Sequence, residues 1–145
     1  MIHRFDVPVR TYSESNLREH WTKAHKRHTT QQAFTRYYFM KNVPDPIQLP
    51  CTVTLIRTAT RPLDDDNLVS AFKWIRDELS ECIIPNASKT YIDRHRRVKK
   101  LRGRVDSDPR IKWLYSQEKT LLYGFRVIIE EAESPHAALK TPLAP

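Results

Sequence analysis

The sequence lacks the segments that would carry it into or across a membrane. It has no apolar run near the length of a membrane-spanning helix, and no basic stretch followed by an apolar one at its start. It has only two cysteines, Cys51 and Cys82, and neither has the closely spaced partners of a zinc site. Both lie in segments with a buried pattern, so we expect reduced thiols in a cytoplasmic protein.

Internal repeats are also absent, and the length of 145 residues leaves room for one core of ordinary size. We expect a single domain over residues 1–131 with a basic insertion at about 85–105. Residues 132–145 contain three prolines and no aromatic residue, which predicts a loose tail. The formal net charge of +8 predicts a polyanionic partner, most commonly nucleic acid.

The hydrophobic pattern predicts an α+β fold in which a small mixed sheet of about four strands packs against two main helices. The expected order is β-α-β-α-β-β. Alternation predicts strands, the last two paired as a hairpin, over residues 2–9, 51–60, 111–118 and 122–130. Helical periodicity and breaker residues predict helices over residues 16–41 and 65–81.

The first predicted helix begins at Asn16, which forms a capping-box pattern with Glu19. Its expected apolar face contains Leu17, Trp21, Ala24 and His28. Basic residues lie mostly on its exterior, where a solvated surface and a phosphate-contacting surface are equally good interpretations. The candidates for nucleic-acid contact in this region are Asn16, Arg18, Lys26 and Arg27.

Three consecutive carboxylates, Asp64, Asp65 and Asp66, stand between the second predicted strand and the second predicted helix. The first and third are two residues apart, so their side chains point to the same side and repel each other unless they share a cation or a proton. Mg²⁺ binds a few carboxylates together with water and phosphate oxygens. A second acidic turn offers Asp106 or Asp108 as a third ligand. Helix capping is the alternative interpretation, and it explains one or two of the acids better than three.

A metal ion held there would polarise a phosphate and lower the pKa of an attacking water. A nearby cation would offset the developing charge. Lys73 lies two helical turns after Asp66, and Arg61 precedes the acids, so either residue could serve. An ordinary solvated helix lysine is the alternative interpretation of Lys73.

A run of basic residues, 89–104, contains eight Lys or Arg among sixteen residues and a single acid, Asp93. Its few apolar residues predict a mobile or partly helical loop that orders against phosphates. Solvent-exposed padding is the alternative, but the basic context favours binding. The further candidates for nucleic-acid contact are Arg61, Arg94, Arg96, Arg97, Lys99 and Lys100.

Three segments resemble one known family. Asp64-Asp65-Asp66-Asn67-Leu68 resembles the Asp-x-Asp-Asn-Leu motif of RusA-type Holliday junction resolvases, including their phage and prophage relatives. The segment 106–111, followed by Trp113, Tyr115 and Gln117, is similar to their third-acid region. The segment 15–21, followed by Lys26-Arg27, is similar to their N-terminal motif. The resemblance spans about residues 2–131 in matching order.

The resemblance implies a homodimeric endonuclease that depends on Mg²⁺, with Mn²⁺ as the alternative ion, and cuts paired strands of a four-way DNA junction. It places two metal ligands at Asp64 and Asp66 and the third at Asp106, with Asp108 as a close competitor. Asn67 would order the turn.

The sequence departs from this family in two places. The family's catalytic lysine lies four residues after the second acid, where this chain has Ser70, with Lys73 one turn further on. The stretch before the third acid is also longer, and it contains the basic run. Two other functions therefore stay open: a branched-DNA-binding protein of the same fold with weak or lost cleavage, and an RNA-binding or regulatory protein in which the acids only cap a helix.

Overall fold

The computed structural model describes residues 1–15, 17–85, 90–100 and 105–132. No helix in these ranges is long and apolar enough to cross a membrane. Asn16 and residues 133–145 of the predicted tail lie outside the described residues. The elements in chain order are β1 (Ile2–Val7), α1 (Trp21–Asn42), β2 (Cys51–Ala59), α2 (Asp65–Ala71), α3 (Lys73–Ile83), β3 (Thr90–Ile92), β4 (Val98–Lys100), η1 (Val105–Ser107), β5 (Ile111–Lys119) and β6 (Gly124–Glu131).

The predicted α+β class and four-stranded mixed sheet are confirmed. The strand order is β1-β6-β2-β5; β2 and β5 run parallel, and the other neighbours are antiparallel. The predicted β5–β6 hairpin is wrong, because β2 lies between these two strands. Every second residue of β2, from Cys51 to Ala59, is buried. Such a strand is stabilised by sheet neighbours on both edges, and β2 takes the central place.

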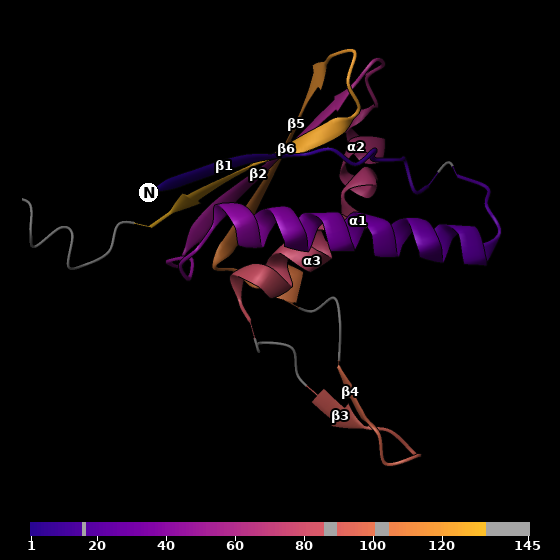
Figure 1. Ribbon diagram of the computed structural model, residues 1–145, viewed down its shortest axis with the longest axis vertical. Coiled ribbons are helices and arrows are strands. Elements are labelled where there is room, and N and C mark those ends of the chain that lie inside the picture. The colour runs from indigo at the N-terminus through magenta and orange to yellow at the C-terminus, as the bar shows by residue number, and fades with distance from the viewer. Residues whose placement is uncertain (16, 86–89, 101–104, 133–145) are drawn as a thin grey trace, which may run out of the picture.

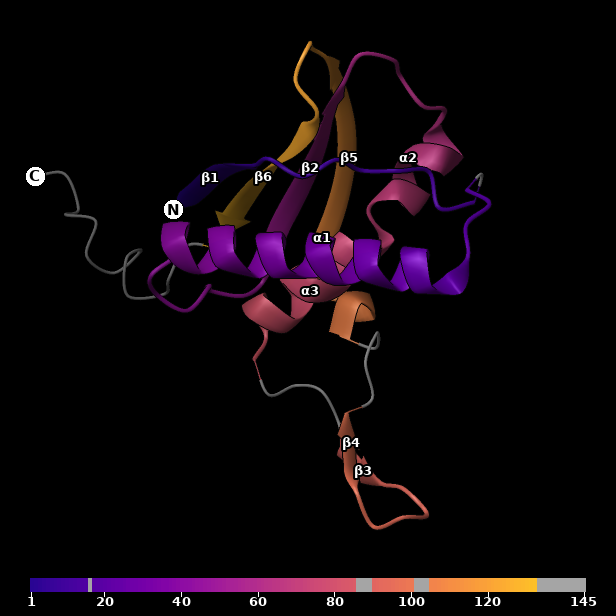
Figure 2. The same cartoon turned by 45° about the vertical axis from the view of Figure 1, so that its right-hand side comes forward.

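Helices α1 and α3 cover one face of the sheet, and α1 crosses it over its whole width (Figures 1 and 2). The core beneath them includes Phe72, Ile75 and Leu79, all 0% exposed. From the sheet, alternate residues of β6 point into this core: Phe125, Val127 and Ile129. This follows from the two-residue period of a strand, which the sequence pattern showed correctly.

The first helix begins later than predicted. Its N-cap is His20, whose ring accepts a hydrogen bond from the Thr22 N–H, so the helix does not start at the Asn16 capping box. Trp21 is 73% exposed, and the buried residues are Gln31, Thr35 and Phe39. The predicted apolar face is therefore wrong: the first turns of α1 face the preceding segment instead of the sheet.

The second predicted helix is two helices, which meet at Phe72. This residue has φ −99° and ψ 5°, and its N–H donates to the Val69 carbonyl in a tight turn. Its ring is completely buried and packs edge-on against Phe125 and tilted against Tyr115. Tertiary burial of this one ring thus coincides with the change of helix direction that local propensity does not show.

Residues 90–100 of the basic run form a hairpin of β3 and β4, where we predicted a mobile or partly helical loop. Its turn is closed by Asp93, whose carboxylate accepts from the backbone N–H groups of His95 and Arg97. Arg96 takes a positive φ of 59° there. The hairpin projects away from the sheet in both views (Figures 1 and 2). Its exposed basic side chains are Arg94, Arg96, Arg97 and Lys99.

The start of β6 requires glycine for space. A Cβ on Gly124 would lie 2.8 Å from the carbonyl oxygen of Val7, in the neighbouring strand. We expect Gly124→Ala to lower the free energy of unfolding by about 1–3 kcal/mol, because backbone has to move. The exposed Leu121→Ala should change it by no more than about 0.5 kcal/mol. Urea unfolding measures both, and equal values for the two variants would contradict this account.

Candidate functional site

The first acidic group lies where β2 has ended and α2 begins. Asp64 is the N-cap of α2, and its Oδ1 accepts from the Asn67 N–H at 2.9 Å. Asp65 and Asp66 form the first helical turn. All three carboxylates are exposed. The capping interpretation is therefore correct for Asp64, while Asp66 has no capping bond to a backbone N–H among the described hydrogen bonds and lies open to solvent.

Asn67, in the first turn of α2, contacts the N-terminal segment, which is the part of the chain between β1 and α1. Its Oδ1 accepts from Ser13 Oγ at 2.6 Å and from Ser15 Oγ at 2.7 Å. Ser70, at the position where the resemblance implies a lysine, lies 3.5 Å from Ser15 through its Oγ and donates to the Asn67 carbonyl at 3.3 Å. Ser13 and Ser15 therefore lie directly beside the first turn of α2.

The second acidic group is already engaged with arginines. The carboxylate of Asp106 lies 3.3 Å from Arg76 Nε, and its backbone carbonyl accepts from Arg76 Nη2 at 2.8 Å and from Trp113 Nε1 at 3.1 Å. Asp108 accepts from the side chain and the N–H of Arg110. These hydrogen bonds, the side-chain one first, lower the pKa of Asp108 to about 2.

The two acidic groups lie at opposite ends of the β2–β5 pair. The backbone of Leu63 exchanges two hydrogen bonds with the Gln117 side chain, at 2.9 and 2.7 Å, whereas Asp106 lies against Trp113. Four residues of strand separate these contacts, or about 13 Å. Oxygens that share one Mg²⁺ lie within about 4 Å of each other. Figure 2 shows η1 beside α3, well apart from the start of α2.

In the described ranges, no three His, Cys, Asp or Glu side chains are grouped closely enough to hold a metal ion. The chain by itself therefore does not bring Asp106 or Asp108 to Asp64 and Asp66, and the three-acid site that the sequence predicts is not formed within one copy. The physical reason is the parallel β2–β5 pairing, which puts the residue after one strand and the residue before the other at opposite ends.

Lys73 lies on the far side of the Phe72 turn from the acids of α2. Its ammonium sits 4.9 Å from the Trp74 ring centroid, and it acts electrostatically on Asp77. The argument from a continuous helix, which put Lys73 on the face of Asp66, is thus wrong. Asp77 itself was missed. Burial, and next the charge of Asp106, raise its pKa to about 6. Its spacing of four residues from Lys73 was the available signal.

Arg27 has a different role from the predicted phosphate contact. Its guanidinium donates to Glu14 Oε2 at 2.9 Å and to Glu19 Oε1 at 2.7 and 3.0 Å, and its side chain is only 13% exposed. His28 Nε2 lies 3.1 Å from the same Glu14 carboxylate. Arg27 therefore fastens the N-terminal segment onto α1. Burial alone would raise the pKa of Glu14, but hydrogen bonds from Arg27 and His28 outweigh it and lower the pKa.

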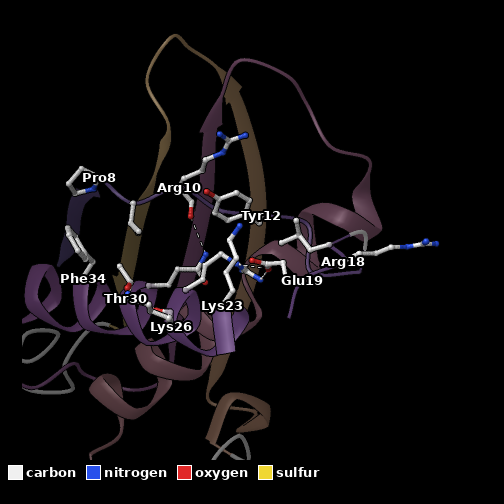
Figure 3. A pocket seen from close by; sticks show the side chains of 13 residues that line it. Pro8, Arg10, Tyr12, Arg18, Glu19, Lys23, Lys26, Thr30 and Phe34 are labelled. Carbon is white, nitrogen blue, oxygen red and sulfur yellow. Dashed lines mark hydrogen bonds and ion pairs between the residues drawn. The ribbon is translucent and has the colours of Figure 1, made fainter. Parts of the chain in front are cut away.

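The remaining predicted contacts with a described side chain are exposed, and they lie in separate parts of the surface. Arg18 and Lys26 line a pocket between α1 and the described residues of the segment before it, and Lys23, which we did not single out, lies with them (Figure 3). Arg61 is exposed ahead of the acids. The other basic candidates lie on the β3–β4 hairpin. For Lys100, which is one of these hairpin candidates, the structure describes the backbone but not the side chain.

No protein-family model, no curated protein and no solved structure matches this chain. The family resemblance accordingly rests on the order and spacing of the motifs alone.

The hydrogen bonds from Arg27 to Glu14 and Glu19 give a test of stability against pH. We expect Arg27→Gln to lower the free energy of unfolding at pH 7 by about 1–3 kcal/mol, since two largely buried carboxylates lose their donor. The folded-state pKa of Glu14 is lowered, so its stabilisation is complete above the unfolded-state value of about 4.5 and is lost as pH falls through the folded value.

The deficit of Arg27→Gln should therefore shrink at pH 3 when urea unfolding is compared at the two pH values. Arg18→Gln is the matched control, because Arg18 is exposed and has no carboxylate partner among the described residues. A deficit that is the same at both pH values would show that the ion pair is not its source.

Proposed function

We propose that this chain is a metal-dependent, structure-specific endodeoxyribonuclease of the RusA type, which resolves four-way (Holliday) junctions in DNA recombination and repair. The observation that carries the proposal is the exposed pair Asp64 and Asp66 at the start of α2, in a chain with a net charge of +8. The order of motifs over residues 2–131 and the exposed basic hairpin support a branched DNA substrate. The buried free thiols of Cys51 and Cys82 suit the reducing cytoplasm.

The carboxylates of Asp64 and Asp66 are suitable ligands for Mg²⁺ or Mn²⁺, although they supply only part of a coordination shell. Mg²⁺ sites in phosphoryl-transfer proteins use one or two carboxylates and complete the shell with water and substrate phosphate. Asp66 and the Oδ2 of Asp64 can supply such a pair, since the capping bond uses only Asp64 Oδ1. When bound, the ion would polarise the scissile phosphate and make water a better nucleophile.

The third acid is what one copy does not supply, and we place it in trans. In a two-fold dimer, Asp106 or Asp108 of a second copy approaches Asp64 and Asp66 of the first, and symmetry repeats the arrangement. Two equivalent sites then fit two paired strands of a junction. Arg76 and Arg110 neutralise these acids in the single chain, where they have no cation.

Removal of one metal ligand tests the site. Asp66→Asn should reduce the rate of four-way junction cleavage in Mg²⁺ about a hundredfold or more, because the charge that attracts the ion is lost. Asp65→Asn is the matched control from the same helical turn and should cleave as the wild type does. Symmetric nicking that survives Asp66→Asn would reject the assignment of the site.

Subunit mixing tests the arrangement in trans. Asp66→Asn and the double variant Asp106→Asn with Asp108→Asn should each be inactive. A mixed dimer of the two contains one site with all of its acids and one site that keeps only Asp64, so mixing should restore nicking of one strand. If all acids come from one copy, each site of the mixed dimer keeps a defect, and the mixture stays inactive.

A second candidate function is a branched-DNA-binding protein of the same fold without turnover. Two observations favour it: Ser70 at the lysine position, and the separation of the two acidic groups. Tight binding of a four-way junction by the wild type, with no cleavage in Mg²⁺ or Mn²⁺, would support this function over the nuclease. Equal affinity for structured RNA and no stabilisation by metal would instead support an RNA-binding protein.

A further inference from the structure

A second site with the properties of a ligand pocket lies apart from the acids of α2. Residues 8–15 and 17–19 lie over the first half of α1 and leave a pocket of about 720 Å³ between them, a volume typical of sites for small organic ligands (Figure 3). Aromatic and apolar side chains form part of its wall, among them Tyr12, Leu17 and Phe34. The pocket can therefore hold a flat, partly apolar group.

The charge around this pocket is strongly positive and only partly neutralised. Its one acidic lining residue, Glu19, is held by Arg27. Among the described residues, Lys23 and Lys26 have no carboxylate partner, although both line the pocket and are exposed. An anionic group is attracted to this place, and most strongly at low salt.

A further cation, Arg57, contacts Thr11 in the segment before α1. Arg57 is 7% exposed, and its described partners are neutral oxygens: Thr11 Oγ1 at 3.1 Å and the Arg61 carbonyl at 2.8 Å. Burial, and next the charge of Arg10, lower its pKa from the usual arginine range, though not enough to discharge it. The guanidinium of Arg10 in turn stacks over the rings of Tyr12 and Tyr123, at 5.0 and 4.2 Å.

One residue that lines the pocket has a buried acceptor without a partner among the described residues. Gln31 is 1% exposed and lines the pocket; its Nε2 donates to the Arg10 carbonyl at 3.2 Å. Its Oε1 has no hydrogen-bond partner among the described residues. Exchanging the two amide atoms would set Oε1 against the Arg10 carbonyl, so the hydrogen bond defines the orientation. A buried acceptor without a donor is costly, and a ligand N–H that reaches this atom would satisfy it.

We propose that this pocket binds one unpaired nucleotide of a DNA strand. Its phosphate lies at Lys23 and Lys26, its base lies in the space lined by Tyr12 and Phe34, and a base N–H donates to Gln31 Oε1. Stacking on aromatic rings beside backbone-tracking cations is the general mode by which proteins bind single-stranded nucleic acid. A phosphate alone would use only the lysines, and an apolar ligand would use only the walls.

The pocket and the acids of α2 share one piece of chain. Tyr12 and Leu17 line the pocket, while Ser13 and Ser15 between them bind Asn67 in the first turn of α2. A strand with one nucleotide in the pocket would therefore continue towards Asp64 and Asp66. The assignment of the strand to a DNA junction rests on the proposed function, but binding in the pocket requires no cleavage.

The test is the binding of a fluorescein-labelled oligothymidylate, followed by anisotropy with the full chain, without divalent metal, over a range of salt. Lys23→Ala with Lys26→Ala should weaken binding about tenfold and reduce the slope of log affinity against log salt by about 0.7 for each lysine. Phe34→Ala should weaken binding about tenfold and leave the slope unchanged, because stacking is not an ionic contact. All three replaced side chains are exposed, and circular dichroism checks that the variants fold.

Two controls are matched to these variants. Arg4→Ala with Lys41→Ala removes two positive charges elsewhere, and Tyr37→Ala removes an exposed ring from the next turn of α1; both should bind as the wild type does. Ultraviolet crosslinking of the oligothymidylate should label the peptides that contain Tyr12 or Phe34. Equal losses in the controls, or labelling confined to the β3–β4 hairpin, would overturn the pocket.

The outcomes separate this inference from the nuclease. Pocket variants that bind normally while the wild type cuts a four-way junction would reject the pocket and leave the nuclease standing. Pocket-dependent binding by a wild type that cuts nothing in Mg²⁺ or Mn²⁺ would do the reverse. Inorganic phosphate that competes as well as the oligothymidylate, at equal phosphate concentration, would reduce the site to a simple anion site and overturn the nucleotide proposal.

Discussion

The parallel pairing of β2 with β5 is the constraint that places the candidate functional residues. From Cys51↔Ile111 to Ala59↔Lys119 the two strands run side by side in one direction. The chain must therefore return along the sheet between them, and α2 and α3 make this return. The acids that follow β2 and the acids that precede β5 are left at opposite ends of the pair. Any chemistry that needs both groups needs a second copy or a different arrangement of the chain.

The N-terminal segment depends on a second set of contacts, which are polar. Arg27 holds Glu14 and Glu19 on the side of α1, and Asn67 holds Ser13 and Ser15 on the side of α2. The segment thereby forms one wall of the pocket and also flanks the exposed acids. A residue that looks like a phosphate ligand in the sequence, Arg27, acts here by organising the surface that other basic residues present.

Much of the fold followed from local pattern. Alternation over 51–60 predicted β2 to within one residue, because a strand buried on one face repeats with period two. Among the expectations that were wrong, three fail where tertiary contacts outweigh local preference. Phe72 divides one predicted helix in two, β2 separates the predicted β5–β6 hairpin, and α1 begins at Trp21 and not at the capping-box pattern.

The sequence by itself determined the α+β class, the basic character of the surface and the exposed acids at the start of α2, because these depend on composition and on local periodicity. Only the tertiary structure decided which charges meet. It paired Asp106 with Arg76 and Asp108 with Arg110, half-buried Asp77, and left the buried Gln31 Oε1 without a donor among the described residues. Such contacts join residues that sheet topology and helix packing bring together, and no local pattern contains that information.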